Sequence, residues 1–141
     1  MISLIKKYES LRLQAYYCPA GKLTIGYGTT VYPDGKPIKE GQYITKEYAE
    51  VLLLDYVQKN IYPIFKKIPY DLTLDQRRAI ASLVYNIGAS SFLRSKLFKA
   101  ICNKDIEGIF KNWDWIKSNN KVLKGLIKRR AEEKWIFLKD C

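Results

Sequence analysis

The first part of the chain changes from a helical spacing of apolar residues to an alternating, strand-like pattern. The apolar residues at helical spacing share one face: Ile2, Ile5 and Tyr8. This spacing predicts a short helix that ends near Glu9. Two runs rich in Tyr, Thr and Ile follow at residues 14–18 and 22–27, joined by the turn sequence Pro19-Ala20-Gly21. The pattern therefore predicts a helix that leads into a β-hairpin, with a carboxylate at the junction.

After the hairpin, the pattern predicts the rest of a small lobe and then a long helix. Residues 30–32 are expected to add a third short strand before the turn sequence Pro33-Asp34-Gly35. These segments predict a strand-containing lobe from about residue 11 to residue 44. Thr45 can cap the helix that follows, and Pro63 should kink or end it, so that it spans about residues 45–66.

Residues 67–141 have the spacing of a helical lobe. A capping-box sequence, Thr73 to Gln76, precedes an apolar face that continues until Gly88 ends the helix. The further helices expected are at residues 91–101, 105–113 and 122–138, with Asn103 and the Asn119-Asn120 pair between them. No internal repeat or linker interrupts the pattern, which favours one compact α+β domain over residues 1–141. Trp113, Trp115 and Trp135 are most simply core residues.

Charge narrows the class of partner. Lys and Arg number 25 against 14 Asp and Glu, which gives a formal net charge of +11. Such a field favours polyanions: nucleic acid, an anionic membrane surface, or a cell wall that carries carboxylates and phosphates. The basic residues are spread along the chain instead of gathered into one arm, so no nucleic-acid-binding module is predicted.

Cysteine usage and hydropathy limit the class of protein further. Cys18, Cys102 and Cys141 have no metal-binding spacing and histidine is absent, so we expect no metal site and no cofactor. A disulfide between two of the three stays open, although Cys102 is most simply a small buried residue and Cys141 a free thiol. No stretch reaches the roughly 20 apolar residues of a membrane span, and no signal core begins the chain. We expect a soluble, leaderless chain without stable membrane insertion.

The segment from Tyr8 to Thr30 holds most of the candidate chemistry. Hydrolysis of a glycosidic bond needs one acid to protonate the leaving oxygen and a second group on the other side of the sugar to manage water. Glu9 can be that acid if it is still protonated near neutral pH. Gly26 and Gly28 indicate close backbone approach, because no phosphate-binding helix follows them. A lone glutamate at a helix end is otherwise a solvated surface group.

The spacing of these residues resembles a known family. Glu9, Cys18 and Thr24, followed by Ile25-Gly26-Tyr27-Gly28, are similar to the Glu/Asp/Thr signature of the tailed-phage lysozymes, or endolysins, which are muramidases. The other segments that carry the resemblance are Tyr85-Asn86-Ile87-Gly88, Phe92 to Ser95, and the run from Gly125 to Glu133, which holds Arg129 and Arg130. The resemblance covers nearly the whole chain. It implies a lysozyme-like fold with a small strand-containing lobe and a larger helical lobe, which includes the N-terminal helix, joined by the long helix.

The resemblance also implies roles for individual residues. Thr24 would position the hydrolytic water, and Tyr85, Asn86 and Ser95 would line the glycan groove, although Tyr85 can equally be a core residue. Either Arg129 or Arg130 would pair with Glu9 and orient it. Such an arginine favours the ionised carboxylate, so burial of Glu9 must outweigh it if Glu9 donates a proton.

Cys18 departs from the family pattern, which usually has Asp at this position. A thiol is neutral at its reference pKa of about 8.5, whereas an Asp is charged at neutral pH. Three interpretations stay open: Cys18 acts as a thiolate base or nucleophile, it only helps to hold a water, or catalysis is lost and the cleft binds glycan. We favour retained activity, since cysteine can carry negative charge there and is a known alternative in the resembled family.

The resemblance therefore predicts an endolysin that cleaves the β-1,4 bond between N-acetylmuramic acid and N-acetylglucosamine in bacterial peptidoglycan. It would act as a monomer, without nucleic acid, and would wait in the host cytoplasm before it reaches the wall. The alternatives are a non-catalytic wall-binding protein and, further off, a basic protein that binds nucleic acid through charge alone.

Overall fold

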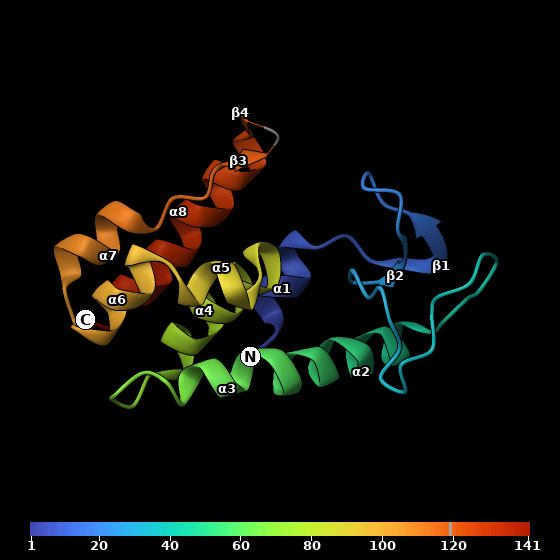
Figure 1. The fold of residues 1–141 in the computed structure, drawn as a ribbon, viewed down its shortest axis with the longest axis horizontal. Coiled ribbons are helices and arrows are strands. Elements are labelled where there is room, and N and C mark those ends of the chain that lie inside the picture. Colours follow the sequence, from blue (N-terminus) through green and yellow to red (C-terminus); the bar gives the residue numbers. More distant parts are fainter. Residues whose placement is uncertain (119) are drawn as a thin grey trace. The chain divides into compact units, whose positions relative to one another are not determined.

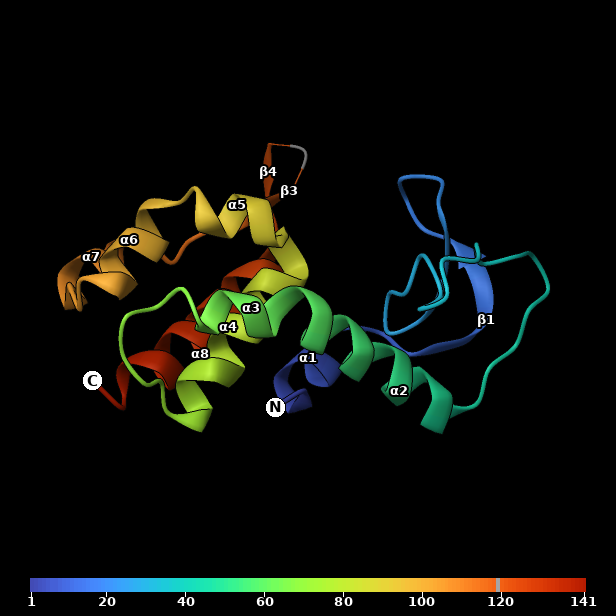
Figure 2. The same cartoon turned by 60° about the horizontal axis from the view of Figure 1, so that its bottom comes forward.

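A computed structural model describes residues 1–118 and 120–141 of the chain. The chain divides into two compact units, one of residues Ile2–Lys59 and the other of Asn60–Cys141 together with Met1. The division falls inside the segment expected to form the long helix. Each unit is described by itself below, and Figures 1 and 2 show the elements of both.

The first unit contains helix α1 (Ser3–Tyr8), strands β1 (Arg12–Tyr17) and β2 (Leu23–Gly26), and helix α2 (Lys46–Tyr56). The strands pair antiparallel, with Tyr16 opposite Thr24 and Tyr17 opposite Leu23, so the predicted helix and hairpin are confirmed. The core of the unit contains Ile25, Ile38 and Leu52, flanked by Ala15, Leu23, Tyr32 and Ile44. The ammonium of Lys6 in α1 pairs with the Glu50 carboxylate in α2, which ties the N-terminal helix to the rest of the unit.

Gly26 allows β2 to approach α2 closely. Its φ of 68° lies in the left-handed region, and a Cβ there would stand 3.4 Å from the Ala49 Cβ atom. This agrees with the sequence-based interpretation of close backbone approach at Gly26. Any larger residue would strain the strand that carries Thr24.

The expected helix at residues 45–66 is a helical run of three segments. Thr45 caps α2, because its Oγ1 accepts a hydrogen bond from the Tyr48 N–H at 3.0 Å. A π-helical segment, Val57–Ile61, follows, and helix α3 (Tyr62–Phe65) ends the run. Pro63 lies early in α3, where its missing N–H costs least, so the irregular turn directly before it agrees with the predicted kink.

The second unit is helical and is built around α4 (Leu74–Ile87) and α8 (Lys124–Leu138), which pack against each other. The capping box at the start of α4 is confirmed: Thr73 Oγ1 accepts from the Gln76 N–H at 3.1 Å, and the Thr73 N–H donates to Gln76 Oε1 at 3.0 Å. Gly88, with φ 92°, ends α4 as predicted. The shorter elements are α5 (Ala89–Leu93), α6 (Lys96–Cys102), α7 (Ile106–Asn112), β3 (Lys117–Ser118) and β4 (Lys121–Val122).

Several expectations are wrong in detail. Residues 30–32 form no strand, since Val31 makes one isolated bridge to Pro37. The single helix expected at residues 91–101 is divided, because the Ser95 hydroxyl caps a new helix at that point. The hairpin of β3 and β4 was not predicted, and α8 begins two residues later than expected. Of the expected Asn119-Asn120 loop, Asn119 lies outside the described residues, and Asn120 has a left-handed φ of 63°.

The tryptophans and cysteines also differ from a simple core assignment. Trp113 is buried, whereas Trp135 is 66% exposed, so its assignment to the core is wrong. Cys18, Cys102 and Cys141 are all free thiols, and Cys102 is only partly buried. Within residues 1–118 and 120–141, no helix combines the length and hydrophobicity needed to cross a membrane.

Candidate active site

Glu9 lies where α1 ends and the chain turns towards β1. Its backbone is extended, with φ −91° and ψ 130°, and its N–H donates to the Ile5 carbonyl at 2.8 Å, which closes the last helical turn. The side chain is half-buried. Its backbone is thus fixed by a helix end while its carboxyl group stays partly open to solvent, a combination that suits a group that must meet substrate.

Cys18 and Thr24 lie on the two arms of the β1–β2 hairpin. The Cys18 N–H donates to the Lys22 carbonyl at 2.9 Å, and the Gly21 N–H returns to the Cys18 carbonyl at 2.8 Å, which closes the turn. Thr24 is 4% exposed, and its Oγ1 donates to the same Lys22 carbonyl at 3.1 Å. The hairpin thus brings the thiol and the hydroxyl of the predicted site together.

The turn favours the ionised form of Cys18. The pKa of its thiol lies below the ordinary value, and the largest cause is a backbone hydrogen bond from Lys22, followed in the opposite direction by burial. Smaller hydrogen bonds from the Ala20 backbone and the Thr24 hydroxyl act with Lys22. The single Thr24 hydroxyl proton can go to the Lys22 carbonyl or to the sulfur, and a thiolate would attract it. These donors make a negative charge at position 18 easier to hold.

Arg129 and Arg130 belong to a buried network centred on Glu133, which the sequence did not identify as a central residue. Arg129 and Arg130 are 4% and 2% exposed, and Glu133 is fully buried. Arg129 Nε lies 3.3 Å from Glu133 Oε2, and Arg130 Nη2 donates to the same oxygen at 3.0 Å. Arg130 Nε lies 2.7 Å from Oε1 without directing its N–H at that oxygen, so this contact is an ion pair. Both guanidinium groups are therefore buried and contact the Glu133 carboxylate.

Other helices supply donors and acceptors to this network. The Trp113 indole N–H, which follows α7, donates to Glu133 Oε1 at 3.2 Å, and the Ser82 hydroxyl in α4 donates to Oε2. Arg129 Nη2 donates to the Ser82 carbonyl at 3.0 Å. Burial raises the pKa of the Glu133 carboxyl, and the guanidiniums and the Ser82 and Trp113 donors act against burial. The spacing of Arg129 and Arg130 from Glu133, four and three residues, was the available sequence signal.

We expect Glu133→Gln to lower the free energy of unfolding by about 3–5 kcal/mol, because it leaves two buried guanidiniums without their counter-charge. Urea denaturation followed by circular dichroism would measure the change. Glu107→Gln is the matched control, since Glu107 pairs with Lys111 on the exposed side of α7 and should change stability little. Equal stability of the two variants would contradict the structural role assigned to Glu133.

The three predicted groove residues, Tyr85, Asn86 and Ser95, differ in their burial and in the hydrogen bonds that their side chains already make. Asn86 is exposed, and its Oδ1 accepts from Arg130 Nη1 at 2.9 Å, which fixes the amide and leaves its N–H groups as donors. The Ser95 hydroxyl accepts from the Phe98 N–H at 3.0 Å and donates to the Phe92 carbonyl at 2.6 Å, so it serves the start of α6. Tyr85 is half-buried. Their contact with glycan, and that of either arginine with Glu9, stay predictions.

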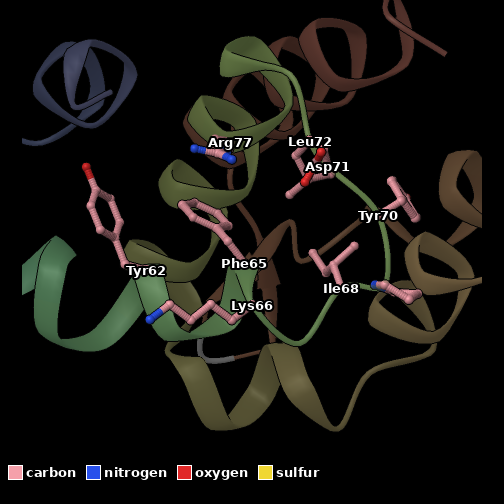
Figure 3. A pocket seen from close by; sticks show the side chains of 9 residues that line it. Tyr62, Phe65, Lys66, Ile68, Tyr70, Asp71, Leu72 and Arg77 are labelled. Carbon is pink, nitrogen blue, oxygen red and sulfur yellow. The ribbon is translucent and has the colours of Figure 1, made fainter.

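Two cavities have linings made of other residues. In the second unit, a cavity of about 540 Å³ is lined by Tyr62, Phe65, Tyr70 and Arg77 among others, and Figure 3 shows the Arg77 side chain beside the Phe65 ring, 5.8 Å from its centroid. In the first unit, a cavity of about 650 Å³ is lined by residues such as Tyr32, Tyr43 and Tyr48. The described lining of neither cavity includes Glu9, Cys18 or Thr24.

Comparison with known proteins places this arrangement in a family. Residues 6–133 match the phage lysozyme family. An endolysin of Acyrthosiphon pisum secondary endosymbiont phage 1 is 42% identical over 139 residues, which cover 95% of this chain and 92% of the relative. The solved structure of an endolysin from Escherichia coli O157:H7 phage FAHEc1 is 35% identical in sequence and superposes with a TM-score of 0.86. The match covers 99% of this chain and 91% of the endolysin chain.

A second solved structure, the muramidase domain of SpmX from Asticaccaulis excentricus, is 32% identical with a TM-score of 0.83, covering 97% of this chain and 93% of its own. The expected lysozyme-like α+β fold, with a small antiparallel sheet and a mostly helical body, is thereby confirmed. Because the match extends over nearly the whole sequence and is supported by close relatives and solved structures alike, this chain belongs to the phage lysozyme family.

Proposed function

We propose that this chain is a phage endolysin, a glycoside hydrolase that degrades bacterial peptidoglycan. The observation that carries the proposal is the placement of Glu9 at a helix end and of Cys18 and Thr24 on the following hairpin, in a member of the phage lysozyme family. The bond cleaved is the β-1,4 link between N-acetylmuramic acid and N-acetylglucosamine, as the family resemblance implies.

In this proposal, Glu9 is the general acid and Cys18 the general base. Glu9 transfers its proton to the glycosidic oxygen as the bond to the anomeric carbon breaks. A water held by Thr24 attacks that carbon and gives a proton to the Cys18 thiolate, so that the charge moves from sulfur to the Glu9 carboxylate. Exchange with solvent restores both groups. The donors around the Cys18 sulfur support this role, because they favour the thiolate that a base requires.

The glycan strand would contact the second unit at Tyr85 and Asn86. Asn86 is exposed and its amide is held by Arg130, so its N–H groups can donate to an acetamido or hydroxyl oxygen. The half-buried Tyr85 offers a ring face for a sugar. Ser95 would line the glycan groove at the start of α6. Its hydroxyl would contribute little to glycan binding, because it is already hydrogen-bonded to the Phe92 carbonyl and the Phe98 N–H. Arg129 or Arg130 would orient Glu9.

The protein would act as a monomer that stays in the host cytoplasm until a membrane lesion gives access to the cell wall. Peptidoglycan carries carboxylates, and the net charge of +11 favours association with such a polymer. In this proposal the positive charge promotes binding to the cell wall, and nucleic acid is not a partner.

Isolated peptidoglycan under reducing conditions provides the test. The purified protein should clear a suspension of wall fragments and release oligosaccharides whose new reducing ends are N-acetylmuramic acid, identified by borohydride reduction and mass spectrometry. New reducing ends on N-acetylglucosamine would identify a different bond. Binding to the fragments without clearing would support the non-catalytic alternative instead.

A further inference from the structure

Helix α8 buries charged residues beside the apolar Phe137 and leaves large apolar side chains exposed among lysines. Its inward side buries the charged residues Arg129, Arg130 and Glu133, whereas Ile127 and Trp135 are 44% and 66% exposed. A helix of a globular protein usually turns its apolar stripe inward and its charges outward. The buried charges are explained by the network around Glu133. Of the exposed apolar residues, Trp135 has the Lys139 ammonium 5.4 Å from its ring centroid, a contact that leaves the side chain 66% exposed.

The exposed residues form a continuous stripe along one side of the helix. The outer face of α8 is defined here by Lys124, Ile127, Lys128, Ala131 and Trp135, all of which are exposed. Successive members are one, three or four positions apart, so at 3.6 residues per turn they line one side over about 16 Å. The hairpin of β3 and β4, which adjoins the start of α8 (Figures 1 and 2), adds Val122 at 52% exposure. Large apolar side chains that gather in this way mark an interaction surface.

The exposed charge on the outer face of α8 is positive. In the part of the chain that the structure describes, neither Lys124 nor Lys128 forms an ion pair, and Lys121 in β4 is exposed beside them. Lys139 contrasts with them, because it pairs with Asp75 at 2.9 Å. The lysines near the start of α8 therefore present positive charge on the outer face, and the nearest carboxylate of the helix is the half-buried Glu132, four residues after Lys128.

The position of these lysines is unfavourable for the helix itself. The N-terminus of a helix carries partial positive charge and is stabilised by acidic residues or side-chain caps. The first turn of α8 has no acidic residue, and Leu123 at the cap position makes no side-chain hydrogen bond. Lysines at the N-terminus of a helix are repelled by its partial positive charge. Residues in such an unfavourable position commonly serve a function.

We propose that the outer face of α8 docks on an anionic phospholipid surface. Ile127 and Trp135 enter the boundary between headgroups and acyl chains, and Lys124 and Lys128 extend their ammonium groups to lipid phosphates. Tryptophan is favoured at this boundary because its ring is apolar and its N–H is polar. The helix lies along the surface and does not span the membrane.

Two other occupants fit this face less well. A second copy of the chain would bring its own lysines against Lys124 and Lys128, and like charges oppose that contact. A polyanion without an apolar part would neutralise the lysines but leave Ile127 and Trp135 in water. An anionic lipid surface satisfies the charged and the apolar residues together.

Vesicle sedimentation tests the proposal with the full chain. Vesicles of phosphatidylcholine that contain phosphatidylglycerol should bind the protein, and vesicles of pure phosphatidylcholine should bind it much less. Lys124→Glu with Lys128→Glu should weaken binding by roughly tenfold or more. The same charge change at Lys66 and Lys67, exposed residues after α3, is the control and should weaken it less.

A second pair of variants separates docking from charge attraction. Ile127→Ser with Trp135→Ser keeps the net charge and should still weaken binding by roughly tenfold, because it removes most of the apolar area. Tyr43→Ser with Val51→Ser, which alters residues at least half exposed in the first unit, should bind like the parent chain. Thermal melts verify folding, and clearing of isolated peptidoglycan should be unchanged in all four pairs.

Equal binding of the parent and of the Ile127 and Trp135 variant would overturn the proposal, as would equal binding to neutral and anionic vesicles. Self-association that the Ile127 and Trp135 variant abolishes, with no lipid binding, would assign the face to a second copy. Loss of clearing together with loss of lipid binding would assign it to the wall polymer. The proposed hydrolysis of peptidoglycan is judged separately, by clearing in the parent chain.

Discussion

Glu9→Gln is expected to slow peptidoglycan hydrolysis by about two to four orders of magnitude, the usual contribution of a positioned general acid. The amide has the size of the carboxyl group but has no acidic proton to give to the leaving oxygen. Folding should be preserved, because the hydrogen bond that ends α1 comes from the backbone N–H of residue 9 and not from its side chain. The rate of reducing-end release from isolated wall fragments is the measurement.

Glu47→Gln is the matched control for this substitution. Glu47 is an exposed acid in the first turn of α2, in the same unit of the chain, and the same change there should leave the rate of hydrolysis nearly unaltered. Full activity of Glu9→Gln would remove Glu9 from the role of acid. Equal loss in both variants would indicate that net charge, and not proton donation, governs the rate.

Cys18→Ser is expected to lose activity by about two orders of magnitude or more, while Cys18→Asp retains it. A serine hydroxyl keeps the hydrogen bonds of the turn but does not ionise near neutral pH, whereas an aspartate is charged there. The matched control is Cys102→Ser, since Cys102 is a partly buried thiol whose pKa is raised by burial. If Cys18→Ser is as active as the parent chain, Cys18 only holds a water.

The pH dependence separates these roles further. A base works when it is deprotonated, so activity should rise with pH through the pKa of Cys18, which lies below the ordinary thiol value because of the Lys22 backbone hydrogen bond. In Cys18→Asp, the rising limb should move to lower pH, because a carboxyl group ionises near pH 4. Profiles of kcat/KM for the two proteins measure this shift. Coincident profiles would mean that the limb belongs to another group.

Stereochemistry tests whether Cys18 is a base or a nucleophile. Direct attack by water inverts the anomeric carbon, whereas a covalent glycosyl-enzyme retains its configuration. NMR of the product immediately after cleavage should therefore show the inverted anomer. A retained product, or a sugar adduct on Cys18 in mass spectra, would replace the base with a nucleophile.

Local rules predicted the elements whose signals lie within a few residues. The capping box at Thr73 and Gln76 and the glycine at residue 88 fixed both ends of α4, because each acts on backbone groups of its own helix. The hairpin from residue 12 to residue 26 followed from its turn sequence and strand composition. The break at Ser95 was missed, because serine is compatible both with the interior of a helix and with its cap.

Long-range contacts account for what the sequence did not predict. Arg129 and Arg130 look like solvated residues of a basic helix, and their burial depends on Ser82, Asn86 and Trp113, which are distant in sequence. The candidate site was predicted as residue types at a spacing that resembles a family. The backbone N–H and hydroxyl donors around the Cys18 sulfur could not be predicted from the sequence, because they depend on the conformation of the turn.

The shared carboxylate of Glu133 also has a consequence for how the second unit unfolds. Both guanidiniums lie on the same helix as Glu133, whereas its neutral donors, Ser82 and Trp113, come from α4 and from the residue after α7, so the full set of hydrogen bonds to the carboxylate forms only when all three segments are packed. Undocking α4 or the segment after α7 removes one of the hydrogen-bond donors that offset the burial of the Glu133 carboxylate. Such mutual dependence raises the cooperativity of unfolding and leaves few stable partly folded forms for a protease to attack.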